Sequence, residues 1–254
     1  MKYITSSENG RYKELKKLSA RSYRRAEAGL FLAEGERIAA DALECGAAEY
    51  FVIDEGYGEA DAAALEARAE VYRFSDKLFH AVSDTKTTQG IIAVCRVRTD
   101  GADGIDHLRG LLVICDGVSD PGNLGTILRT AECAGAAGVL LLDGCADRYN
   151  PKSVRATMGS IFRVPVYLCE VGALARLTAH EIIAAALDNA EPLYDTRFGE
   201  NTAILIGSEA RGVSKEAAAY AARRVTIPMR GGAESLNAAV AAGLMMYEVR
   251  RQNR

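Results

Sequence analysis

The hydrophobic positions in the second half of the chain form short apolar runs that alternate with longer segments of helical periodicity. Strands are predicted at 111–115, 138–142, 164–168, 182–187, 203–206 and 225–227, and helices at 123–135, 151–159, 171–178, 214–222 and 235–250. Apolar strands that alternate with helices are typical of a parallel sheet covered on both faces. Residues 110–254 are therefore predicted to form one α/β domain.

The first 97 residues show the same alternation on a smaller scale. Helices are predicted at 8–28, 35–45 and 59–69, strands at 31–33, 50–53, 71–74 and 90–97, and one or two helical turns at 76–82. Residues 98–109 are mostly polar and include two glycines, which is typical of a linker. The sequence thus predicts a small α/β domain at 1–97, a linker at 98–109 and the larger domain at 110–254.

Basic side chains gather at the N-terminus. Residues 1–25 contain eight Lys and Arg and two Glu, a net charge of +6, whereas the whole chain has a net charge of −3. A basic arm on a mildly acidic body suits a protein that contacts phosphates along one edge. A solvated helix face without a specific partner fits this charge pattern about equally well.

The composition argues against several classes of protein. The hydrophobic content of 49% and the charged content of 26% are ordinary for a soluble globular chain. No apolar run is long enough to span a bilayer, and the N-terminus lacks the apolar core of a signal peptide. The six cysteines form no C-x-x-C pair, and the three histidines show no ligand spacing. We therefore expect a cytoplasmic protein with reduced thiols and no metal site.

The first segment with candidate chemistry, 116–131, follows a predicted strand and opens a helix. Pro121 and Gly122 indicate a turn, and Asn123 is a residue type that often caps a helix. Gly125 permits a ligand or another backbone to approach the first turn. Arg129 lies in the second turn, where a surface ion pair is the ordinary interpretation. Read alone, the segment predicts a strand–helix loop with a helix start suited to phosphate.

The second segment, 204–213, runs from an apolar strand into Gly207, Ser208 and Glu209, with Gly212 three residues later. Ligands of open α/β sheets bind outside the carboxyl ends of strands, which is where Gly207 is expected. Turn geometry explains the two glycines equally well, and a helix cap is the ordinary interpretation of Glu209.

The third segment, 227–243, runs from a strand through a Gly-Gly loop into an Ala-rich helix. Its polar positions are Glu234, Ser235 and Asn237. Exposed amides at a helix N-terminus are where α/β proteins hold polar ligands. One apolar stripe at helical spacing consists of Leu236, Val240, Leu244 and Tyr247. The small residues between 238 and 243 predict close packing against another element.

In order and spacing, the three segments resemble the three signature motifs of the SpoU (TrmH-type) RNA ribose methyltransferases of the SPOUT superfamily. The resemblance covers about residues 111–250. Residues 1–97 resemble the substrate-binding domain that often precedes this catalytic domain. The similar stretches are Ile4-Thr5-Ser6, 29–38 (GLFLAEGERI) and 83–92 (SDTKTTQGII).

The resemblance implies both a fold and a reaction. Members of the family have a parallel α/β catalytic domain whose C-terminal chain forms a trefoil knot, which the hydrophobic pattern by itself does not indicate. They use S-adenosyl-L-methionine to methylate a ribose 2′-hydroxyl in ribosomal or transfer RNA. They work as homodimers with residues of both subunits near one site, and their chemistry needs no metal.

The resemblance also implies roles for individual residues. Cofactor binding is expected at Gly207, Ile227, Leu236, Met229, Leu205 and Ser208. The polar positions around the reacting groups are Arg129, Asn123, Glu209, Asn237 and Ser235. Arg129 is the position nominated for catalysis. A guanidinium stabilises a developing alkoxide, whereas a general base would have to give up a proton that arginine almost always keeps. RNA contacts are expected from the small domain and from Lys13, Lys16, Lys17, Arg21, Arg24 and Arg25.

Two positions depart from the family pattern. Ala210 stands where the family often has glycine, which argues against a positive φ there, and Ala239 stands where a small hydroxyl residue is common. Two other classes of protein fit the sequence less well than the methyltransferase. An RNA-binding protein with an inactive site, acting in RNA assembly, is disfavoured by the presence of Arg129 and Asn237. A dehydrogenase requires a G-x-G-x-x-G motif after the first strand, which 116–125 does not provide.

Overall fold

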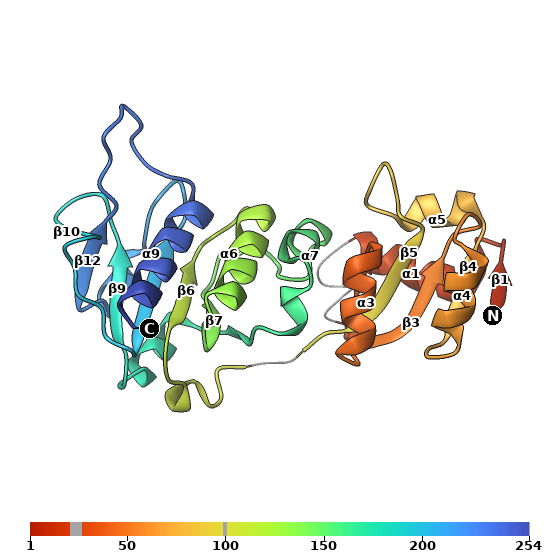
Figure 1. Cartoon of the computed structure of the whole chain (residues 1–254), viewed down its shortest axis with the longest axis horizontal. Helices are drawn as coiled ribbons and strands as arrows, with labels where there is room; N and C mark the ends of the chain where they lie inside the picture. The colour runs from red at the N-terminus through yellow and green to blue at the C-terminus, as the bar shows by residue number, and fades with distance from the viewer. Residues whose placement is uncertain (21–26, 99–100, 254) are drawn as a thin grey trace. The chain divides into compact units, whose positions relative to one another are not determined.

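The computed structural model describes residues 1–20, 27–98 and 101–253, and these fall into two compact units (Figure 1). The first unit consists of Met1–Thr99 and Tyr149–Phe162, and the second of Asp100–Arg148 and Arg163–Arg254. The first boundary falls inside the predicted linker. Residues 149–162, which the sequence analysis assigned to the larger domain, pack with the small unit instead.

The first unit contains a five-stranded mixed sheet in the order β1-β4-β3-β5-β2. Its strands are β1 (Lys2–Ile4), β2 (Leu30–Glu34), β3 (Ala48–Ile53), β4 (Val71–Phe74) and β5 (Ile91–Arg96). Its helices are α1 (Gly10–Ala20), α3 (Glu36–Glu44), α4 (Glu59–Glu66), α5 (Asp76–Val82) and α7 (Pro151–Thr157). β4 is parallel to β1 and β3, whereas β5 is antiparallel to β3 and β2. The predicted α/β alternation is confirmed, and β1 was not predicted.

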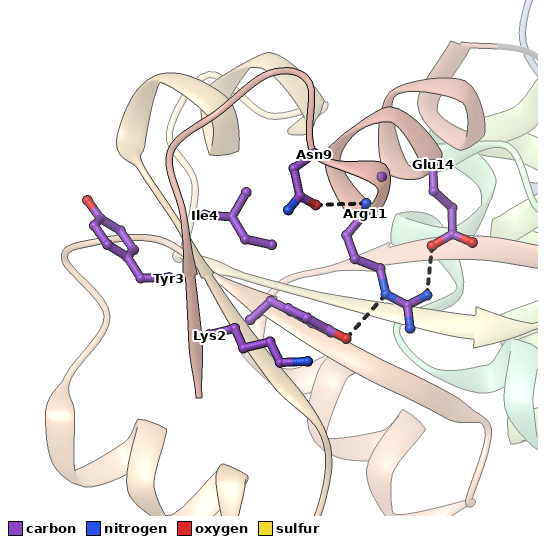
Figure 2. Close-up of a pocket in the computed structure, with 8 residues that line it drawn as sticks. Lys2, Tyr3, Ile4, Asn9, Arg11 and Glu14 are labelled. Atoms are coloured by element: carbon purple, nitrogen blue, oxygen red, sulfur yellow. Dashed lines mark hydrogen bonds and ion pairs between the residues drawn. The ribbon is translucent and has the colours of Figure 1, made fainter.

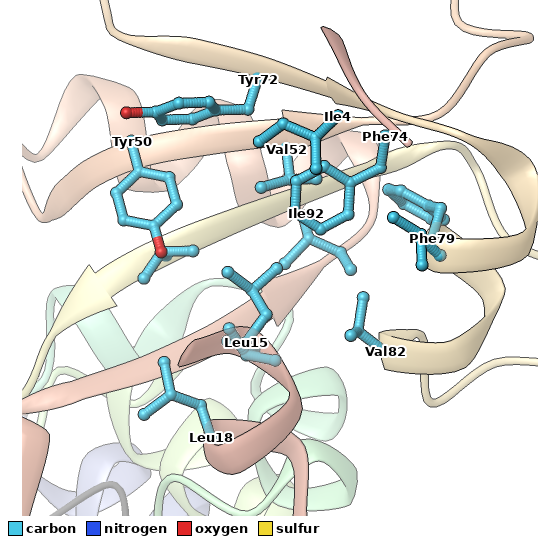
Figure 3. Packing of buried hydrophobic residues seen from close by; sticks show 13 residues of the cluster. Ile4, Leu15, Leu18, Tyr50, Val52, Tyr72, Phe74, Phe79, Val82 and Ile92 are labelled. Carbon is cyan, nitrogen blue, oxygen red and sulfur yellow. The ribbon is translucent and has the colours of Figure 1, made fainter. Parts of the chain in front are cut away.

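Helix α1 is part of the core of the first unit rather than a free basic arm. Leu15 and Leu18, one helical turn apart, are fully buried in a cluster with Phe74 and Phe79 (Figure 3). The lysines at 13, 16 and 17 lie on the exposed side of the helix. The predicted basic residues Arg21, Arg24 and Arg25 lie outside the described residues. Burial of two leucines therefore orients the basic face of α1 toward solvent.

The segment Tyr149–Phe162 is attached to the first unit by aromatic and polar contacts. The ring of Phe31 in β2 packs against Tyr149 at 4.4 Å and against Phe162 at 6.0 Å between centroids. Arg155 of α7 forms an ion pair with Asp84. Helical periodicity predicts which face of a helix is buried but not the element that buries it, which explains why this packing was missed.

The second unit contains a seven-stranded, entirely parallel sheet in the order β10-β12-β9-β11-β6-β7-β8. Its strands are β6 (Leu112–Asp116), β7 (Gly138–Leu141), β8 (Val166–Leu168), β9 (Glu181–Ala185), β10 (Glu191–Pro192), β11 (Thr202–Gly207) and β12 (Arg223–Thr226). The predicted parallel sheet is confirmed. β10 was missed because its two residues are exposed and carry no apolar signal.

Helices cover both faces of this sheet. On one face, strand residues pack with the 3₁₀ turns η1 (Ile105–His107) and η3 (Val171–Arg176) and with the short α8 (Lys215–Ala218). On the other face, α6 (Pro121–Cys133) packs against α9 (Ala238–Gln252). Helix α6 also contacts β7, and α9 contacts β11. The segment 171–176 forms a 3₁₀ helix where an α-helix was predicted. Ile105 is fully buried, so part of the predicted linker belongs to this core.

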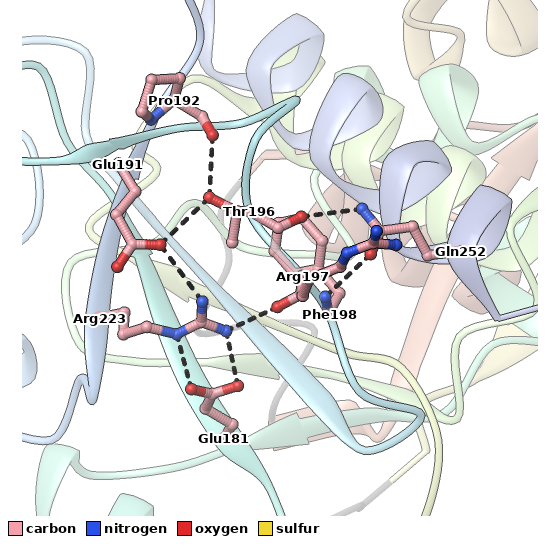
Figure 4. Close-up of polar contacts among 8 residues, drawn as sticks. All are labelled: Glu181, Glu191, Pro192, Thr196, Arg197, Phe198, Arg223 and Gln252. Carbon is pink, nitrogen blue, oxygen red and sulfur yellow. Dashed lines mark hydrogen bonds and ion pairs between the residues drawn. The ribbon is translucent and has the colours of Figure 1, made fainter.

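A polar network fixes the edge of the sheet and the end of α9 (Figure 4). Arg223 of β12 forms a bidentate ion pair with Glu181, with N–O distances of 2.7 and 2.8 Å. Gln252 donates to the carbonyl of Thr196 at 2.9 Å and accepts from the amide of Phe198 at 3.0 Å. The network thereby anchors the strand that leads into the third motif. No described helix combines the length and apolar character that crossing a membrane requires.

Candidate active site

A cavity of about 570 Å³ opens at the carboxyl ends of β9, β11 and β12 in the second unit. It is lined by residues 184–188 and 206–213, by Ala218, Arg224, Val225, Ile227 and Met229, and by Glu234, Ser235, Leu236, Ala238 and Ala241. Parallel α/β sheets bind ligands outside the carboxyl ends of their strands, and cavities of this size hold small ligands. The second and third motifs of the sequence therefore meet in one pocket.

The end of β11 turns into a loop that only glycine permits. A Cβ on Gly207 would lie 2.0 Å from the carbonyl carbon of Gly212 and 2.2 Å from its oxygen. Ser208 and Gly212 exchange two backbone hydrogen bonds of 3.1 and 2.9 Å, and Gly212 has φ +66°. Ala210 does not have a positive φ, so its difference from the family pattern imposes no backbone strain in this chain. The glycines shape the pocket wall by close backbone approach.

Three polar side chains from the three motifs form one hydrogen-bonded chain. Asn237 caps α9 by accepting from the amides of Ala239 and Val240 through its Oδ1, at 3.0 and 3.3 Å. Its Nδ2 donates to Asn123 Oδ1 at 2.9 Å, and Asn123 Nδ2 donates to Glu209. Because Asn237 Oδ1 is used by the cap, the orientation of both amides in the chain is determined. Segments far apart in sequence are thus joined at the mouth of the cavity.

Asp120, not Asn123, caps α6. The Asp120 side chain accepts from the amide of Asn123 at 2.8 Å, and Pro121 occupies the first helical turn. The expectation that Asn123 caps the helix was wrong, because a capping residue type with proline after it lies three positions earlier. This arrangement leaves the Asn123 side chain free to bond to Glu209 and Asn237.

The structure brings most of the predicted site residues together. The predicted cofactor-binding residues that line the cavity are Gly207, Ser208, Ile227, Met229 and Leu236. Leu205 is fully buried within β11 and does not line it. Among the predicted polar residues, Glu209 and Ser235 line the cavity, whereas Asn123 and Asn237 adjoin it through Glu209. The contacts of these side chains with a bound cofactor stay a prediction.

Arg129 is separate from this cavity. It is exposed on α6, shares a helix face with Thr126 and Cys133, and forms no hydrogen bond or ion pair with the described part of the chain. Its backbone position lies about 9 Å along the helix axis from that of Asn123, at 1.5 Å per residue. The surface ion pair considered as its ordinary role is therefore not observed among residues 1–20, 27–98 and 101–253.

Helix α9 exposes three of the four residues of the predicted apolar stripe, whereas Leu236 precedes the helix and lines the cavity. Val240, Leu244 and Tyr247 are 50, 40 and 54% exposed. The buried positions of α9 include Ala238, Ala239, Ala242, Met245, Met246 and Val249. The small side chains permit close packing, as predicted: a Cβ on Gly243 would lie 3.6 Å from the Thr130 methyl group of α6. The exposed stripe leaves an apolar surface without a covering element in the described chain.

The sequence analysis did not single out the segment 184–188, which lines the cavity with Asp188. The signal was present, because this segment ends a predicted strand and the carboxyl ends of parallel strands share one edge. Arg224 and Arg211 also line the cavity and were missed. The nearby cysteines are not candidate nucleophiles, since burial raises the pKa of the thiols of Cys115 and Cys145.

The cavity suits S-adenosyl-L-methionine in size and chemistry. Ile206, Ile227 and Leu236 contribute apolar surface to its lining, and Glu209 and Asp188 contribute carboxylates. Close approach of the backbone at Gly207 gives main-chain groups access to a ligand. Within the described ranges, no group of three or more His, Cys, Asp or Glu residues is placed to hold a metal ion.

Both units resemble known proteins in sequence. Residues 110–247 match the SpoU rRNA Methylase family, and residues 9–93 match the MRM3-like substrate binding domain. The chain is 36% identical to the 23S rRNA (guanosine(2553)-2'-O)-methyltransferase RlmP of Bacillus subtilis, over 98% of this chain and 100% of the relative. It is 32% identical to the 23S rRNA (uridine(2479)-2'-O)-methyltransferase of Streptomyces viridochromogenes, over 97 and 91%.

Solved structures agree with these matches. The AdoMet-bound rRNA methyltransferase from Sinorhizobium meliloti has a TM-score of 0.87 and 31% identity, over 98% of this chain and 97% of that one. The SpoU methyltransferase AviRb from Streptomyces viridochromogenes in complex with AdoMet has a TM-score of 0.87 and 29% identity, over 96 and 98%. The chain belongs to the SpoU rRNA methylase family.

Proposed function

We propose that this protein transfers a methyl group from S-adenosyl-L-methionine to a ribose 2′-hydroxyl of RNA, ribosomal RNA being the expected substrate. The observation that carries the proposal is the hydrogen-bonded chain of Asn123, Glu209 and Asn237 at the cavity. It joins all three motifs by which the family is recognised. Full-length relatives that are named as 23S ribosomal RNA 2′-O-methyltransferases support the choice of substrate.

The pocket residues have a binding and orienting role in this proposal. Gly207, Ile227, Met229 and Leu236 hold the cofactor, largely by backbone and apolar contacts. Bound S-adenosyl-L-methionine supplies a methyl group that its sulfonium has already activated. The protein therefore has mainly to align the ribose oxygen, and proximity and orientation contribute up to about 7–11 kcal/mol to such reactions.

The polar chain positions the ribose in the proposal. With its amide orientation fixed by Asn237, Asn123 holds the Glu209 carboxylate in place at the cavity. A fixed carboxylate accepts hydrogen bonds from ribose hydroxyls, and the Ser235 hydroxyl lines the same cavity. Pre-positioned partners lower the cost of ordering the RNA at the site.

In the proposal, Arg129 supplies the positive charge beside the reacting 2′-oxygen. A guanidinium beside the ribose stabilises the alkoxide that develops on the 2′-oxygen, and its fork of donors suits the adjacent phosphate. Arg129 is unpaired in the described chain and lies outside its own cavity, so we propose that it acts at the site of a partner subunit.

The same reasoning supports a homodimer. The exposed stripe Val240, Leu244 and Tyr247 belongs to α9, which packs against α6, the helix that carries Arg129. A second copy that covers this stripe removes apolar surface from water. The trefoil knot implied by the family resemblance stays a prediction.

RNA contacts are proposed for the small unit, supported by its match to a substrate-binding domain and by the exposed lysines of α1. Lys13 forms an ion pair with Glu8 at 2.6 Å and Lys16 donates to the carbonyl of Ala81 at 2.6 Å, whereas Lys17 has no hydrogen-bond or ion-pair partner in the described chain. Lys17 is therefore the member of the set most available to phosphate. Because the proposed substrate is ribosomal RNA, the cytoplasm is the expected compartment.

The test is transfer of a tritiated methyl group to total RNA from a strain that lacks this protein, followed by nuclease mapping. We expect label in ribosomal RNA as a 2′-O-methyl nucleotide at one position. Label on a base contradicts the proposal. Absence of label in every RNA, with protein that binds the cofactor, contradicts it as well.

A further inference from the structure

A second hollow, of about 780 Å³, lies in the first unit between β1 and the start of α1. It is lined by Lys2, Tyr3, Ile4, Asn9, Gly10, Arg11, Glu14 and Tyr72. Figure 2 shows Lys2 entering it from β1 and Arg11 from α1, whereas Tyr3 points to the other side of the strand. The active-site proposal gives this hollow no role.

The acidic groups of this hollow are already used within the protein. Glu14 accepts from the hydroxyl of Tyr50 and from Arg11 Nη1. Glu70 beside it accepts from the hydroxyl of Tyr72 at 2.6 Å. Neither carboxylate therefore calls for a cation from solution, which argues against a metal or an amine as the ligand.

The groups that remain are donors. Lys2 Nζ has no hydrogen-bond or ion-pair partner in the described chain and lies 6.0 Å from the centroid of the Tyr72 ring. Asn9 uses its Oδ1 to accept from the amide of Arg11 at 2.9 Å, which leaves its Nδ2 without a partner among residues 1–20, 27–98 and 101–253. The ligand that fits such a set is rich in acceptor oxygens and negatively charged.

Arg11 is held in place within the protein, because its Nη1 donates to Glu14 at 3.2 Å and its Nη2 lies 3.9 Å from Glu70. Its guanidinium lies 4.5 Å from the Tyr50 ring centroid and 5.4 Å from that of Tyr72, and its Nε donates to the Tyr72 hydroxyl at 3.3 Å. The two rings are only 2 and 5% exposed, so neither offers a free face on which a nucleobase stacks. The hollow therefore fits a phosphate better than a base.

We propose that this hollow binds a backbone phosphate of the RNA substrate, with Lys2 and Asn9 as donors beside the paired Arg11 guanidinium. The inference rests on the proposed function, since it names a part of the small unit that grips the RNA. A free phosphate shares this chemistry, so the experiment separates the two sources.

The test compares Lys2→Gln with Lys77→Gln, which removes the same charge from an exposed lysine of α5 that does not line the hollow. Binding of each full-length protein to a 23S ribosomal RNA transcript is measured at several salt concentrations. Loss of one phosphate contact makes the negative slope of log affinity against log salt shallower by about 0.7–0.9 and weakens binding roughly threefold to tenfold. Lys77→Gln should leave both values as in the wild type. An unchanged slope in Lys2→Gln overturns the proposal.

Nuclear magnetic resonance then distinguishes the sources of phosphate. The side-chain signals of Lys2 and Asn9 should shift with the RNA transcript. Signals that shift with inorganic phosphate but not with RNA assign the hollow to the free anion and overturn the proposal. Methyl transfer by Lys2→Gln at saturating RNA should equal that of the wild type. Absence of transfer by the wild type counts against the proposed function alone, because the binding results are obtained without the reaction.

Discussion

The side-chain amide of Asn237 donates to the side-chain oxygen of Asn123 at 2.9 Å, across 114 positions of the sequence. Each asparagine has a second fixed contact, Asn237 with the first amides of α9 and Asn123 with Glu209. The order of donors and acceptors therefore leaves one arrangement for the chain. The start of one helix is thereby coupled to the carboxylate at the mouth of the cavity.

Replacement of Asn237 separates helix capping from site geometry. Asn237→Asp keeps an oxygen that caps α9, but it places a second acceptor opposite Asn123 Oδ1 and releases Glu209. We expect unfolding free energy within about 0.5 kcal/mol of the wild type, since Asp and Asn cap equally well, and turnover lower by roughly tenfold to a hundredfold. Urea unfolding and methyl-transfer rates measure the two effects. Asn237→Ala also removes the helix cap, so its free energy of unfolding should fall by about 1 kcal/mol in addition to the loss of turnover. Wild-type turnover in Asn237→Asp would remove the chain from the mechanism.

Gly207 should not tolerate a side chain. In Gly207→Ala the new Cβ would lie 2.0 Å from the Gly212 carbonyl carbon, so the loop has to move away from β11. We expect cofactor affinity to fall at least about tenfold, as close contacts are lost along one wall of the cavity. Calorimetric titration with S-adenosylhomocysteine measures this. Gly172→Ala is the control, because a Cβ there meets nothing within 4 Å. Equal affinity in the two variants would contradict the assigned pocket.

Arg129 should affect turnover without affecting cofactor binding. Arg129→Ala removes a charge-stabilising donor, whose loss costs about a hundredfold or more in rate. It leaves every residue that lines the cavity unchanged. Lys215→Ala, which removes an exposed cation of α8, should retain turnover. Single-turnover transfer rates and cofactor titration test both statements. A wild-type transfer rate in Arg129→Ala would exclude Arg129 from the methyl-transfer mechanism.

The exposed face of α9 should hold the dimer together. Leu244→Asp introduces a charge into the centre of the stripe, so we expect a monomer by light scattering together with loss of transfer. Leu168→Asp is the matched control, because Leu168 is 56% exposed on β8. Mixed dimers of Arg129→Ala and Asn237→Ala should regain part of the activity if Arg129 serves the site of its partner. A monomeric wild type would contradict the shared site.

Acid should destabilise the second unit partly through Glu248. This side chain is 6% exposed, and the Arg251 guanidinium, with Gln252, holds its pKa below the usual range. A lowered folded-state pKa gives stability that is present above the unfolded-state value of about 4.3–4.5 and lost as pH falls through the folded-state value. Between roughly pH 5 and 3, the unfolding free energy of Glu248→Gln should fall less than that of the wild type. Parallel curves for the two proteins would refute this contribution.

The fold was largely predictable because its strands are buried on both faces. Such strands are continuous apolar runs, which is why β6, β7 and β11 were located to within one or two residues. β1 and β10 were missed because they are short and mostly exposed, and their pairing depends on neighbouring strands. The basic helix was predicted, but the burial of Leu15 and Leu18 in the core was not. Truncation of 1–25 therefore tests folding rather than RNA binding.

The site was predictable in its residue types and not in its bonds. The resemblance to the family predicts that Gly207, Ile227 and Leu236 bind the cofactor, and the three residues line one pocket because the carboxyl ends of parallel strands meet at one edge of the sheet. The sequence does not reveal that Asn123 bonds to Glu209 while Asp120 caps the helix, since both residue types are good caps. It also does not reveal which face of α9 is covered.

The most direct test of the account is a crystal structure of the full-length protein with S-adenosyl-L-methionine. We predict that the cofactor occupies the cavity at the ends of β9, β11 and β12, with Glu209 and Asn123 beside its transferable methyl group and Arg129 of a second subunit facing the same group. A cofactor bound elsewhere, or an assembly in which no Arg129 side chain comes near that methyl group, would contradict the account.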